Sequence, residues 1–465
     1  MTVRFSAEEV VKATGAQVTR RGKVAAFTGV CTDTRALTPG CLFVALKGER
    51  FDAHDFLDQA VAAGAAAVMV EDFARAPKNE AATVFAVNDT LVGLGRLANA
   101  HRSRFNIPIV AVTGSNGKTT TKELVGSILS TRGPALKTAG NLNNEIGVPL
   151  TLFNLDETHV AAVIEMGMNH AGEIGRLTRI ARPDAGLITI VQPAHLEGVG
   201  SIEGVAAAKA ELFWGLAKTA TAVVNVDDAR IVFQAEDVPA KKLTWGRTDG
   251  ADVRLVSVEP RGRDGQTLKI AARGSAYTVA LNLVGDHNAN NATGAFALAL
   301  SIGYSPEECV KGLESAHPHS RRLQIVDAPN GVTVVDDCYN ANPSSMTAAL
   351  KTVADLAKNG RAVAVLGDML ELGSSETREH TDMGPTAASL AALVAFFGPR
   401  MKHAHAEAVK TLGDKARHFE DVPSLVAWLT QELKPNDYVL VKGSRGMKLE
   451  RVVEALTGTS TGGGH

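Results

Sequence analysis

The sequence Ile-Val-Ala-Val-Thr-Gly-Ser-Asn-Gly-Lys-Thr-Thr occupies residues 109–120 and decides the fold class. Its first four residues are apolar, which is typical of a buried strand, and the glycines that follow mark a tight loop. A strand, a glycine-rich loop and a helix in this order place backbone N–H groups around a phosphate. Lys118 can then reach the β- and γ-phosphates of a nucleotide, and the Thr119 hydroxyl can hold Mg²⁺. The full G-x-x-x-x-G-K-T pattern would have glycine where this chain has Val112, so the interpretation depends on the strand and helix around the loop.

The loop residues expected to bind the nucleotide are Gly114, Ser115, Asn116, Gly117, Lys118, Thr119 and Thr120. Such a loop occurs in kinases, transport ATPases, switch GTPases and ligases, so the rest of the chain must distinguish these classes. The N-K-x-D motif by which GTPases recognise guanine is absent after the loop.

Strand-like and helix-like segments alternate after the loop. Apolar runs occupy residues 160–164, 187–191 and 222–226, and a helical segment follows each of them. This alternation predicts a parallel sheet that is covered on both faces. Residues 252–283 are richer in strand-forming residues and predict an antiparallel excursion, and an alanine-rich helix is expected over residues 288–301.

Two further units flank this one. The first starts with a capping box of Ser6 and Glu9 and ends at the break Asn106-Ile107-Pro108. Its expected strands are 42–46, 66–70 and 84–87, and its expected helices are 55–63 and 90–105. The last unit has expected strands at 324–327, 332–335, 362–366, 393–397 and 438–441. The predicted fold is therefore α/β with three domains: a mixed N-terminal domain (1–107), a central P-loop domain with a parallel sheet (108–320) and a C-terminal Rossmann-like domain (321–465).

The composition is that of an ordinary soluble chain. Its 465 residues fit about three domains of roughly 100–200 residues each, and a formal net charge of -2 provides no general basic field for nucleic acid. The longest apolar stretch, residues 60–70, is too short for a bilayer, which needs about 20 residues, and no signal peptide is visible. We expect a cytoplasmic protein with no membrane insertion and no nucleic-acid partner. The four cysteines form no C-x-x-C pair and are expected to be reduced thiols; they are Cys31, Cys41, Cys309 and Cys338.

Three polar residues after the loop stand out by position. Glu165 ends an apolar strand, and a carboxylate at the carboxyl edge of the same sheet can bind Mg²⁺. His195 follows the next expected strand and is placed at the same edge. Lys209 lies among alanines on an apolar helix, where it either reaches water with its ammonium group or lies in a site. Spacing alone leaves both interpretations of Lys209 open.

These motifs together resemble those of the Mur ligase family. The resemblance rests on the phosphate loop with its Thr-Lys-Glu continuation, on Glu-Met-Gly-Met-Asn at 165–169 and on Pro-Ala-His-Leu-Glu at 193–197, and it extends from Thr32 to Arg445. It implies two Mg²⁺ ions with Thr119, Glu165, His195 and Lys209 as ligands. Lys209 would carry CO₂ as a carbamate. The catalytic residues implied by the resemblance are Lys118, Glu165, His195 and Lys209.

The resemblance also implies which residues bind ATP outside the loop. Asn288 and Asn291 begin the alanine-rich helix and would meet adenine, although asparagine is also a common helix cap. Arg321 or Arg322 could pair with phosphate in a bidentate manner. Asp337 would contact ATP from the third domain.

The activity implied by the closest branch of the family is ATP-dependent joining of D-alanyl-D-alanine to UDP-N-acetylmuramoyl-tripeptide through an acyl phosphate. Both substrates are small molecules, and a monomer is expected. The residues expected to bind the sugar nucleotide are Thr32, Asp33, Thr34, Arg35, Lys47, Gly48, His54, Asn141, Asn143 and Asn144. Those expected around the dipeptide are Tyr339, Asn340, Lys442, Ser444 and Arg445.

Three other functions compete with this interpretation. A diaminopimelate- or lysine-adding member of the family should carry Asp-Asn-Pro-Arg, which is absent. A folylpolyglutamate synthetase shares the loop but would lack the N-terminal module. A switch or transport ATPase would not need the module before residue 109, and it would turn over nucleotide without either co-substrate.

Overall fold

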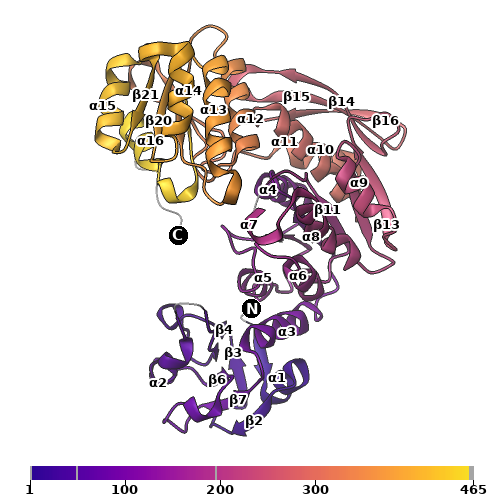
Figure 1. The fold of residues 1–465 in the computed structure, drawn as a ribbon. Coiled ribbons are helices and arrows are strands. Elements are labelled where there is room, and N and C mark those ends of the chain that lie inside the picture. The colour runs from indigo at the N-terminus through magenta and orange to yellow at the C-terminus, as the bar shows by residue number, and fades with distance from the viewer. Residues whose placement is uncertain (1–2, 49–50, 194–195, 460–465) are drawn as a thin grey trace.

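The computed structural model describes residues 3–48, 51–193 and 196–459. Three α/β units follow one another along the chain, with the central unit between the other two (Figure 1). Each unit contains one large sheet, of five, nine and six strands in chain order. The expected α/β architecture of three domains is confirmed, and the large sheet of each unit is mainly parallel.

The N-terminal unit has a five-stranded sheet of order β2-β7-β6-β5-β4, in which only β2 is antiparallel to its neighbour. A small ribbon of β1 and β3 lies beside it. The elements are β1 (Arg4–Ser6), α1 (Ala7–Thr14), β2 (Gln17–Arg20), β3 (Ala26–Thr28), β4 (Val30–Cys31), β5 (Leu42–Val44), α2 (Leu57–Ala62), β6 (Ala67–Val70), β7 (Thr83–Ala86) and α3 (Thr90–Arg102).

Local signals explain how the N-terminal helices begin. The predicted capping box at α1 is present, because the Ser6 hydroxyl accepts from the Glu9 N–H and the Glu9 carboxylate accepts from the Ser6 N–H. The helix expected over residues 55–63 begins instead as a 3₁₀ turn, Ala53–Phe56, and becomes α-helical only at α2. The reason is Asp52, whose side chain accepts from the His54 N–H and so starts the turn early.

The central unit contains a nine-stranded sheet of order β16-β15-β14-β13-β12-β11-β8-β10-β9. Strands β8 to β14 are parallel, and β14, β15 and β16 form the predicted antiparallel excursion. The elements are β8 (Ile109–Thr113), α4 (Lys118–Leu129), β9 (Ala135–Lys137), α5 (Gly147–Leu152), β10 (Ala161–Glu165), α6 (Glu173–Ala181), β11 (Ala185–Ile188), α7 (Leu196–Val199), α8 (Ile202–Trp214), β12 (Thr221–Asn225), α9 (Ala229–Ala235), β13 (Lys241–Gly246), β14 (Val253–Pro260), β15 (Gln266–Ala272), β16 (Ser275–Leu281), α10 (Asp286–Ser301) and α11 (Pro306–Glu314).

Strand β11 differs from its predicted range of 187–191, because it ends at Ile188. The chain beyond it turns onto the phosphate loop. The Ser115 N–H donates to the Ile190 carbonyl (2.8 Å), and the Thr189 hydroxyl donates to the Asn116 carbonyl (2.5 Å). The apolar run therefore leaves the sheet early in order to support the loop.

The C-terminal unit contains a six-stranded sheet of order β17-β18-β22-β19-β20-β21, parallel except for β17. Helices on both of its faces enclose two separate apolar cores. The elements are β17 (Gln324–Asp327), β18 (Thr333–Asp336), α12 (Pro343–Leu356), β19 (Ala362–Gly367), α13 (Glu376–Leu390), β20 (Leu393–Phe397), α14 (Lys402–Leu412), β21 (Ala416–Phe419), α15 (Val422–Glu432), β22 (Tyr438–Lys442) and α16 (Glu450–Thr457).

The N-terminal and central units share one continuous apolar core. Phe5 of β1 meets Phe153 edge to face at 6.4 Å between ring centroids, and the His101 ring bonds to the Leu155 carbonyl (2.9 Å). Asn99 on α3 donates to the last carbonyls of α6. These contacts make the first junction a packed interface.

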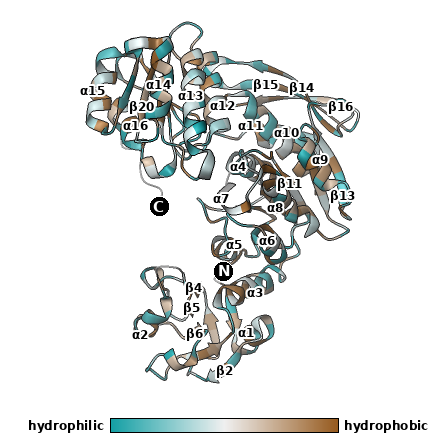
Figure 2. Cartoon of the chain, viewed as in Figure 1, coloured by the Kyte–Doolittle hydropathy of each residue, from teal (hydrophilic) through white to brown (hydrophobic). Residues whose placement is uncertain are grey.

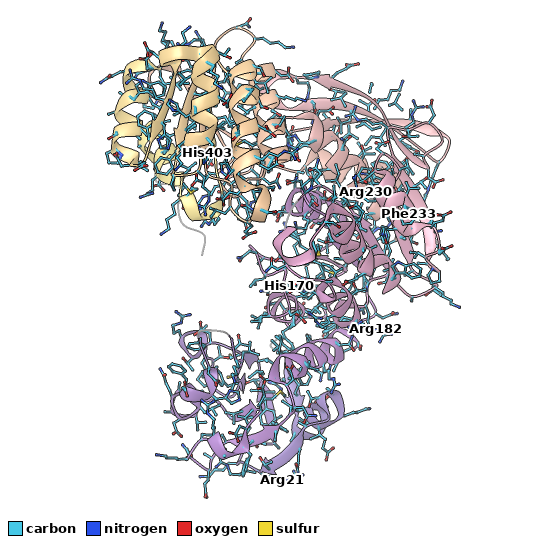
Figure 3. All side chains as sticks on the ribbon, in the orientation of Figure 1. Arg21, His170, Arg182, Arg230, Phe233 and His403 are labelled. Carbon is cyan, nitrogen blue, oxygen red and sulfur yellow. The ribbon has the colours of Figure 1, made fainter. Side chains whose placement is uncertain are left out.

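Apolar residues concentrate on the strands inside each unit, while the outer faces of the helices are largely polar (Figure 2). Phe233 on α9 is an exception, since it is 71% exposed and projects from the central unit (Figure 3). Within the described residues, none of the helices has the length and apolarity that crossing a bilayer requires. No disulfide joins the four cysteines; Cys31 is half-buried and the other three are buried.

Candidate functional site

The phosphate loop connects β8 to α4, as predicted, and its backbone geometry requires two glycines. Gly114 has φ 150°, and a Cβ atom there would lie 1.8 Å from the Thr189 hydroxyl. Gly117 has φ 80°, and its Cβ would lie 2.3 Å from the Asn291 side-chain oxygen. Only glycine fits at these two positions. The first turn of α4 therefore opens toward the loop with its N–H groups and the positive end of its dipole.

Lys118 begins α4 and folds back over the loop. Its ammonium donates to the Gly114 carbonyl at 2.8 Å. Burial lowers the pKa of Lys118, with a further lowering by Arg322, whereas the charge of Glu165 opposes the shift. A half-buried lysine beside an anion-binding loop is suited to pair with a phosphate charge.

Glu165 ends β10 next to the loop, because β10 pairs with β8 in the register Glu165 to Val112. It is 2% exposed. One carboxylate oxygen accepts from the Asn143 amide at 2.9 Å, while Oε2 is buried without a partner among the described residues. An unpartnered, buried carboxylate oxygen beside a phosphate loop fits a divalent cation.

Lys209 lies on α8 and is 1% exposed. The interpretation in which its ammonium reaches water is therefore wrong. Burial lowers the pKa of Lys209 well below its ordinary value, and the nearby charge of Lys118 lowers it further. Both effects disfavour the charged form of the amine relative to that of an exposed lysine, and the neutral form is the nucleophilic one. His195, the other expected metal ligand, lies outside the described residues.

Among the described residues, histidine, cysteine and carboxylate side chains alone do not build a metal site. Within the described part of the chain, no three such residues are grouped so that they could hold an ion. A cation next to Glu165 would need other oxygen ligands, such as the Thr119 hydroxyl or nucleotide phosphates.

The two asparagines of α10 have different surroundings. Asn291 lies against the loop at Gly117 and donates to the Asn288 side-chain oxygen at 3.1 Å. The Asn288 amide donates to the Val284 carbonyl (2.8 Å), which fixes the start of the helix. Of these two side chains, Asn291 is the one in direct contact with the loop.

The two arginines at the start of the C-terminal unit also have different contacts. Arg322 donates to the Thr119 hydroxyl at 3.2 Å and lies over the Tyr339 ring at 4.3 Å. Arg321 instead faces Glu450, at 3.6 Å. The structure therefore places Arg322 at the loop and Arg321 away from it.

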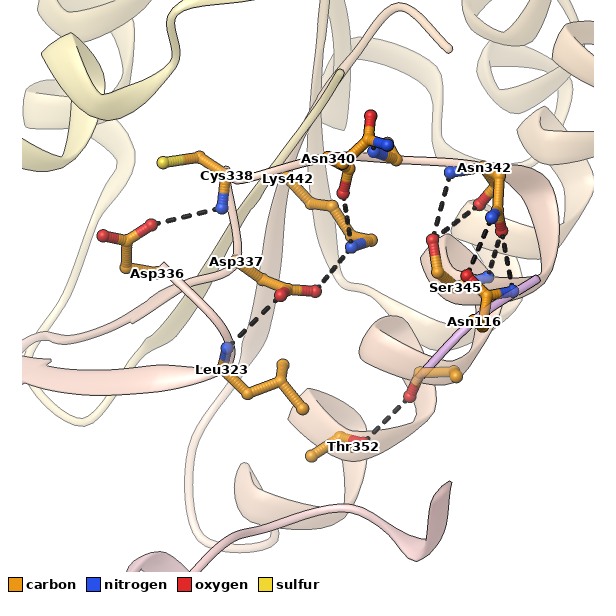
Figure 4. Close-up of polar contacts among 12 residues, drawn as sticks. Asn116, Leu323, Asp336, Asp337, Cys338, Asn340, Asn342, Ser345, Thr352 and Lys442 are labelled. Atoms are coloured by element: carbon orange, nitrogen blue, oxygen red, sulfur yellow. Dashed lines mark hydrogen bonds and ion pairs between the residues drawn. The ribbon is translucent and has the colours of Figure 1, made fainter. Parts of the chain in front are cut away.

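Polar residues after β18 and at the end of β22 form a network that faces the loop (Figure 4). Lys442 donates to the Asp337 carboxylate (2.6 Å) and to the Asn340 carbonyl (3.0 Å). Asn342 and Asn116 exchange amide hydrogen bonds of 2.8 and 3.3 Å across the two units. Sequence reasoning did not select Asn342 as a site residue, because it reads as a simple helix cap.

These groups line one cavity of about 430 Å³ between the central and C-terminal units. Of the expected site residues, it brings together Ser115, Asn116, Gly117, Lys118, Thr119, Asn141, Asn143, Glu165, Tyr339, Asn340, Lys442, Ser444 and Arg445. Arg322, the second of the two arginines offered by the sequence, also lines it, and so do residues that sequence reasoning missed, including Asn342, Ser345 and the loop Leu370–Leu372. That loop follows β19 at the carboxyl edge of its sheet, so the rule that singled out Glu165 could have found it.

A second cavity of about 360 Å³ adjoins the first along the segment Asn141–Ile146. It extends to Leu91 at the start of α3, in the N-terminal unit. The expected sugar-nucleotide residue Asn144 lines this cavity, and Asn141 and Asn143 line both cavities.

The N-terminal residues expected to bind the sugar nucleotide line neither cavity. Asp33 pairs with Arg35 on the surface at 2.6 Å. His54 is buried with both ring nitrogens in use, because one bonds to Asp52 (2.6 Å) and the other accepts from the Glu71 N–H (3.1 Å). In this arrangement His54 shapes its own loop.

Comparison with known proteins agrees with this geometry. The chain is 39% identical over 437 residues to the UDP-N-acetylmuramoyl-tripeptide--D-alanyl-D-alanine ligase of Escherichia coli (strain K12), which covers 93% of this chain and 94% of that protein. The chain belongs to the Mur ligase family. Three family models match it: Mur ligase family, catalytic domain (26–102), Mur ligase middle domain (112–299) and Mur ligase, glutamate ligase domain (321–445).

Other relatives of the Mur ligase family agree in sequence and in structure. The enzyme of the same name from Bacillus subtilis (strain 168) is 37% identical over 440 residues, covering 92% of this chain and 93% of its own. A crystal structure of MurF from Acinetobacter baumannii superposes with a TM-score of 0.89 at 33% identity, covering 98% of this chain and 100% of that one. MurF from Thermotoga maritima in complex with ADP gives a TM-score of 0.82 at 29% identity, covering 94% and 97%.

Proposed function

We propose that this Mur ligase uses ATP to join D-alanyl-D-alanine to UDP-N-acetylmuramoyl-tripeptide, which yields the pentapeptide precursor of peptidoglycan, ADP and phosphate. One observation supports this most directly: the phosphate loop, Glu165, one of whose oxygens has no partner among the described residues, and the polar groups after β22 all line a single cavity. Relatives that match nearly the whole chain carry the name of this ligase.

The reaction requires no nucleophile from the protein. An oxygen of the tripeptide carboxylate attacks the γ-phosphorus of ATP, the bond to ADP breaks, and an acyl phosphate forms. The amine of D-alanyl-D-alanine then attacks the acyl carbon, the C–O bond to phosphate breaks, and the amine gives up a proton. Such a route depends on positioning and charge neutralisation.

Each side chain then has a definite task. Lys118, already drawn over the loop at Gly114, neutralises charge on the transferring phosphoryl group. Arg322, from the C-terminal unit, donates to the Thr119 hydroxyl and would bring a second positive charge to the phosphates. Asn291 would meet the nucleotide from α10.

Magnesium would be held by Thr119, Glu165, His195 and a carbamate on Lys209. When bound, it neutralises charge on the phosphates during transfer. The burial of Lys209 fits this proposal, because it favours the uncharged amine, the form that takes up CO₂ and becomes an anionic oxygen ligand. Two ions would share these ligands.

The remaining substrates would occupy the two sides of the cavity. The segment Asn141–Asn144, with the N-terminal residues 32–35, 47–48 and 54, would bind the sugar nucleotide. Lys442, Ser444 and Arg445, with Tyr339 and Asn340, would surround the dipeptide. The enzyme would act as a monomer in the cytoplasm, where ATP is available.

The first test is Lys118→Ala. Because Lys118 is the only lysine that bonds to the loop in the described structure, we expect kcat to fall by about 100-fold or more. Phosphate release is measured with ATP, UDP-N-acetylmuramoyl-tripeptide and D-alanyl-D-alanine, and with each acceptor left out in turn.

Lys137→Ala, on the outside of the same unit, is the control and should retain most activity. Full turnover by Lys118→Ala would contradict the proposal. Rapid ATP hydrolysis by the wild type without either acceptor would instead indicate an ATPase.

A further inference from the structure

Lys122 is a buried lysine for which the mechanism above has no role. It lies one helical turn after Lys118 on α4 and is 1% exposed. Its ammonium forms an ion pair with Glu123 at 2.6 Å and donates to the Thr138 carbonyl at 2.7 Å. A charge this deeply buried is costly unless it is paired and hydrogen-bonded, and both conditions are met here.

Thr138 connects Lys122 to Glu165. It directly follows β9, and its N–H donates to the Val163 carbonyl of β10 at 3.2 Å. Its hydroxyl accepts from the Glu165 N–H at 2.9 Å. Thr138 therefore accepts one hydrogen bond from Lys122 at its carbonyl and another from the Glu165 N–H at its hydroxyl.

The segment that follows Thr138 holds Glu165 a second time. Asn143 donates from its amide to Glu165 Oε1 (2.9 Å), and its carbonyl accepts from the Gly167 N–H (2.8 Å). The backbone and one oxygen of Glu165 are therefore fixed from a single segment, residues 138–143. The other oxygen, Oε2, stays available for a cation.

We propose that Lys122 is a positioning residue: through Thr138 it fixes the direction of the Glu165 carboxylate and the root of the segment 139–144. This inference rests on the proposed function for the identity of the cation and the sugar nucleotide. Lys122 contacts neither of them. It links the helix that carries the phosphate loop to the carboxylate on the neighbouring strand, so that both are held in one register. Groups that contact a metal ligand directly, as Thr138 contacts Glu165, typically change metal affinity 10- to 100-fold when they are lost, and Lys122 acts through Thr138.

The chain provides a matched control for the ion pair. Lys137 pairs with the same carboxylate, Glu123, at 2.6 Å, but its side chain is 41% exposed and does not bond to Thr138. Removing Lys137 weakens the neutralisation of Glu123 and leaves the path from Lys122 to Glu165 intact. Burial raises the pKa of Glu123, but the charges of Lys122 and Lys137 outweigh it, so the carboxylate stays ionised.

The experiment compares Lys122→Met, Lys137→Met, Thr138→Val and Thr138→Ser in the full-length chain. The main measurement is Mn²⁺ affinity in the presence of ADP, followed by electron paramagnetic resonance, which requires no turnover. Circular dichroism confirms that each variant is folded at the temperature used. We expect Mn²⁺ to bind at least about 10-fold more weakly to Lys122→Met and Thr138→Val, and within about twofold of wild type to Lys137→Met and Thr138→Ser.

A folded Lys122→Met that binds Mn²⁺ like the wild type would overturn the inference, and so would an equal loss in Lys137→Met. If Lys122→Met does not fold, the contrast between Thr138→Val and Thr138→Ser decides the same question. The double variant Lys122→Met/Thr138→Val should lose little more than either single variant, because both act on one path. A wild type without dipeptide-dependent phosphate release would defeat the proposed function, whereas the Mn²⁺ contrasts would still test the positioning role.

Discussion

His380 lies fully buried on α13, and both of its ring nitrogens bond to backbone groups. Nδ1 lies 2.7 Å from the Glu376 carbonyl and must donate, while Nε2 accepts from the Met369 N–H at 3.1 Å. Only the neutral ring with its proton on Nδ1 can make both bonds. Met369 directly precedes the loop Leu370–Leu372 that lines the cavity, so this ring fixes one wall of the site.

A pH dependence follows from His380. Burial lowers its pKa, against the opposing effects of the Glu376 carbonyl and the carboxylates of Asp368 and Glu376; Arg400 lowers it further. The unfolded chain titrates near about 6.5 and therefore binds more protons than the folded chain just below that pH. The contribution of His380 to the free energy of unfolding should be constant above about pH 6.5. Below that pH it should decrease, by at most about 1.4 kcal/mol per pH unit for this one group.

The measurement is the urea midpoint at pH 7.5 and at pH 5.5 for wild type and for His380→Gln. The variant should be less stable at pH 7.5, because it loses the bond to Met369 or to Glu376, and should lose less stability on acidification. An unchanged pH dependence in the variant would show that His380 does not titrate in this range.

At the scale of elements, Asn342 is both a helix cap and a contact between units. Its side-chain oxygen accepts from the Ser345 N–H (2.9 Å) at the start of α12, and its amide donates to Asn116 of the phosphate loop (2.8 Å). Asn342→Ala should lower stability by about 1 kcal/mol through loss of the cap, and it should also weaken ADP binding through loss of the contact.

Asn342→Ser separates these two effects, because serine is an equally good cap but too short to reach Asn116. We expect near wild-type stability in this variant together with weaker ADP binding, measured by calorimetry. Equal ADP affinity in wild type and both variants would show that the contact plays no part in nucleotide binding.

Sequence patterns predicted the elements well wherever local signals were strong. The capping box of α1, the strands β17 and β20 and the antiparallel excursion after β13 agree with the structure. The end of β11 was wrong because hydrogen bonds from the loop at Ser115, more than 70 residues away in the sequence, draw the chain out of the sheet. Hydrophobic periodicity depends only on residues close together in the sequence, so it contains no information about hydrogen bonds to a distant loop.

The candidate site shows the same limit. Residues at strand ends, such as Glu165 and Lys442, could be expected at one edge of their sheets. The sequence could not show which of Arg321 and Arg322 faces the loop. The backbone is left-handed at both Arg321 and Leu323, and this local conformation sets the directions of the two side chains. Lys122 and Thr138 were missed, because a buried lysine on a polar helix turn looks like a surface residue.

At the scale of the whole molecule, the two junctions differ. The N-terminal unit shares its main apolar core with the central unit, whereas the C-terminal unit is built around cores that are almost entirely its own. We propose domain boundaries near 107/108 and 320/321. The first junction would then be rigid, and opening and closing would occur mainly at the second.

Fragments test this arrangement. Residues 1–320 should fold as one cooperative unit, and residues 321–465 should fold alone. A fragment starting at residue 108 would expose Phe153 and the face of α6 that α3 covers, so we expect it to aggregate or to lose several kcal/mol of stability. Circular dichroism and size-exclusion chromatography provide the comparison. A stable, monomeric 108–320 fragment would contradict the shared core.

The half-buried thiol of Cys31 allows the N-terminal unit to be labelled selectively. A hydrogen bond from the Cys41 thiol lowers the pKa of Cys31, which favours the reactive thiolate near neutral pH, while Cys41 itself is buried and its pKa is raised. Cys31 directly precedes Thr32–Arg35, the segment proposed to meet the sugar nucleotide. A maleimide dye should therefore label the unmodified chain at this one thiol. If bound sugar nucleotide slows the labelling, the labelling rate can be used as an optical assay to screen for inhibitors.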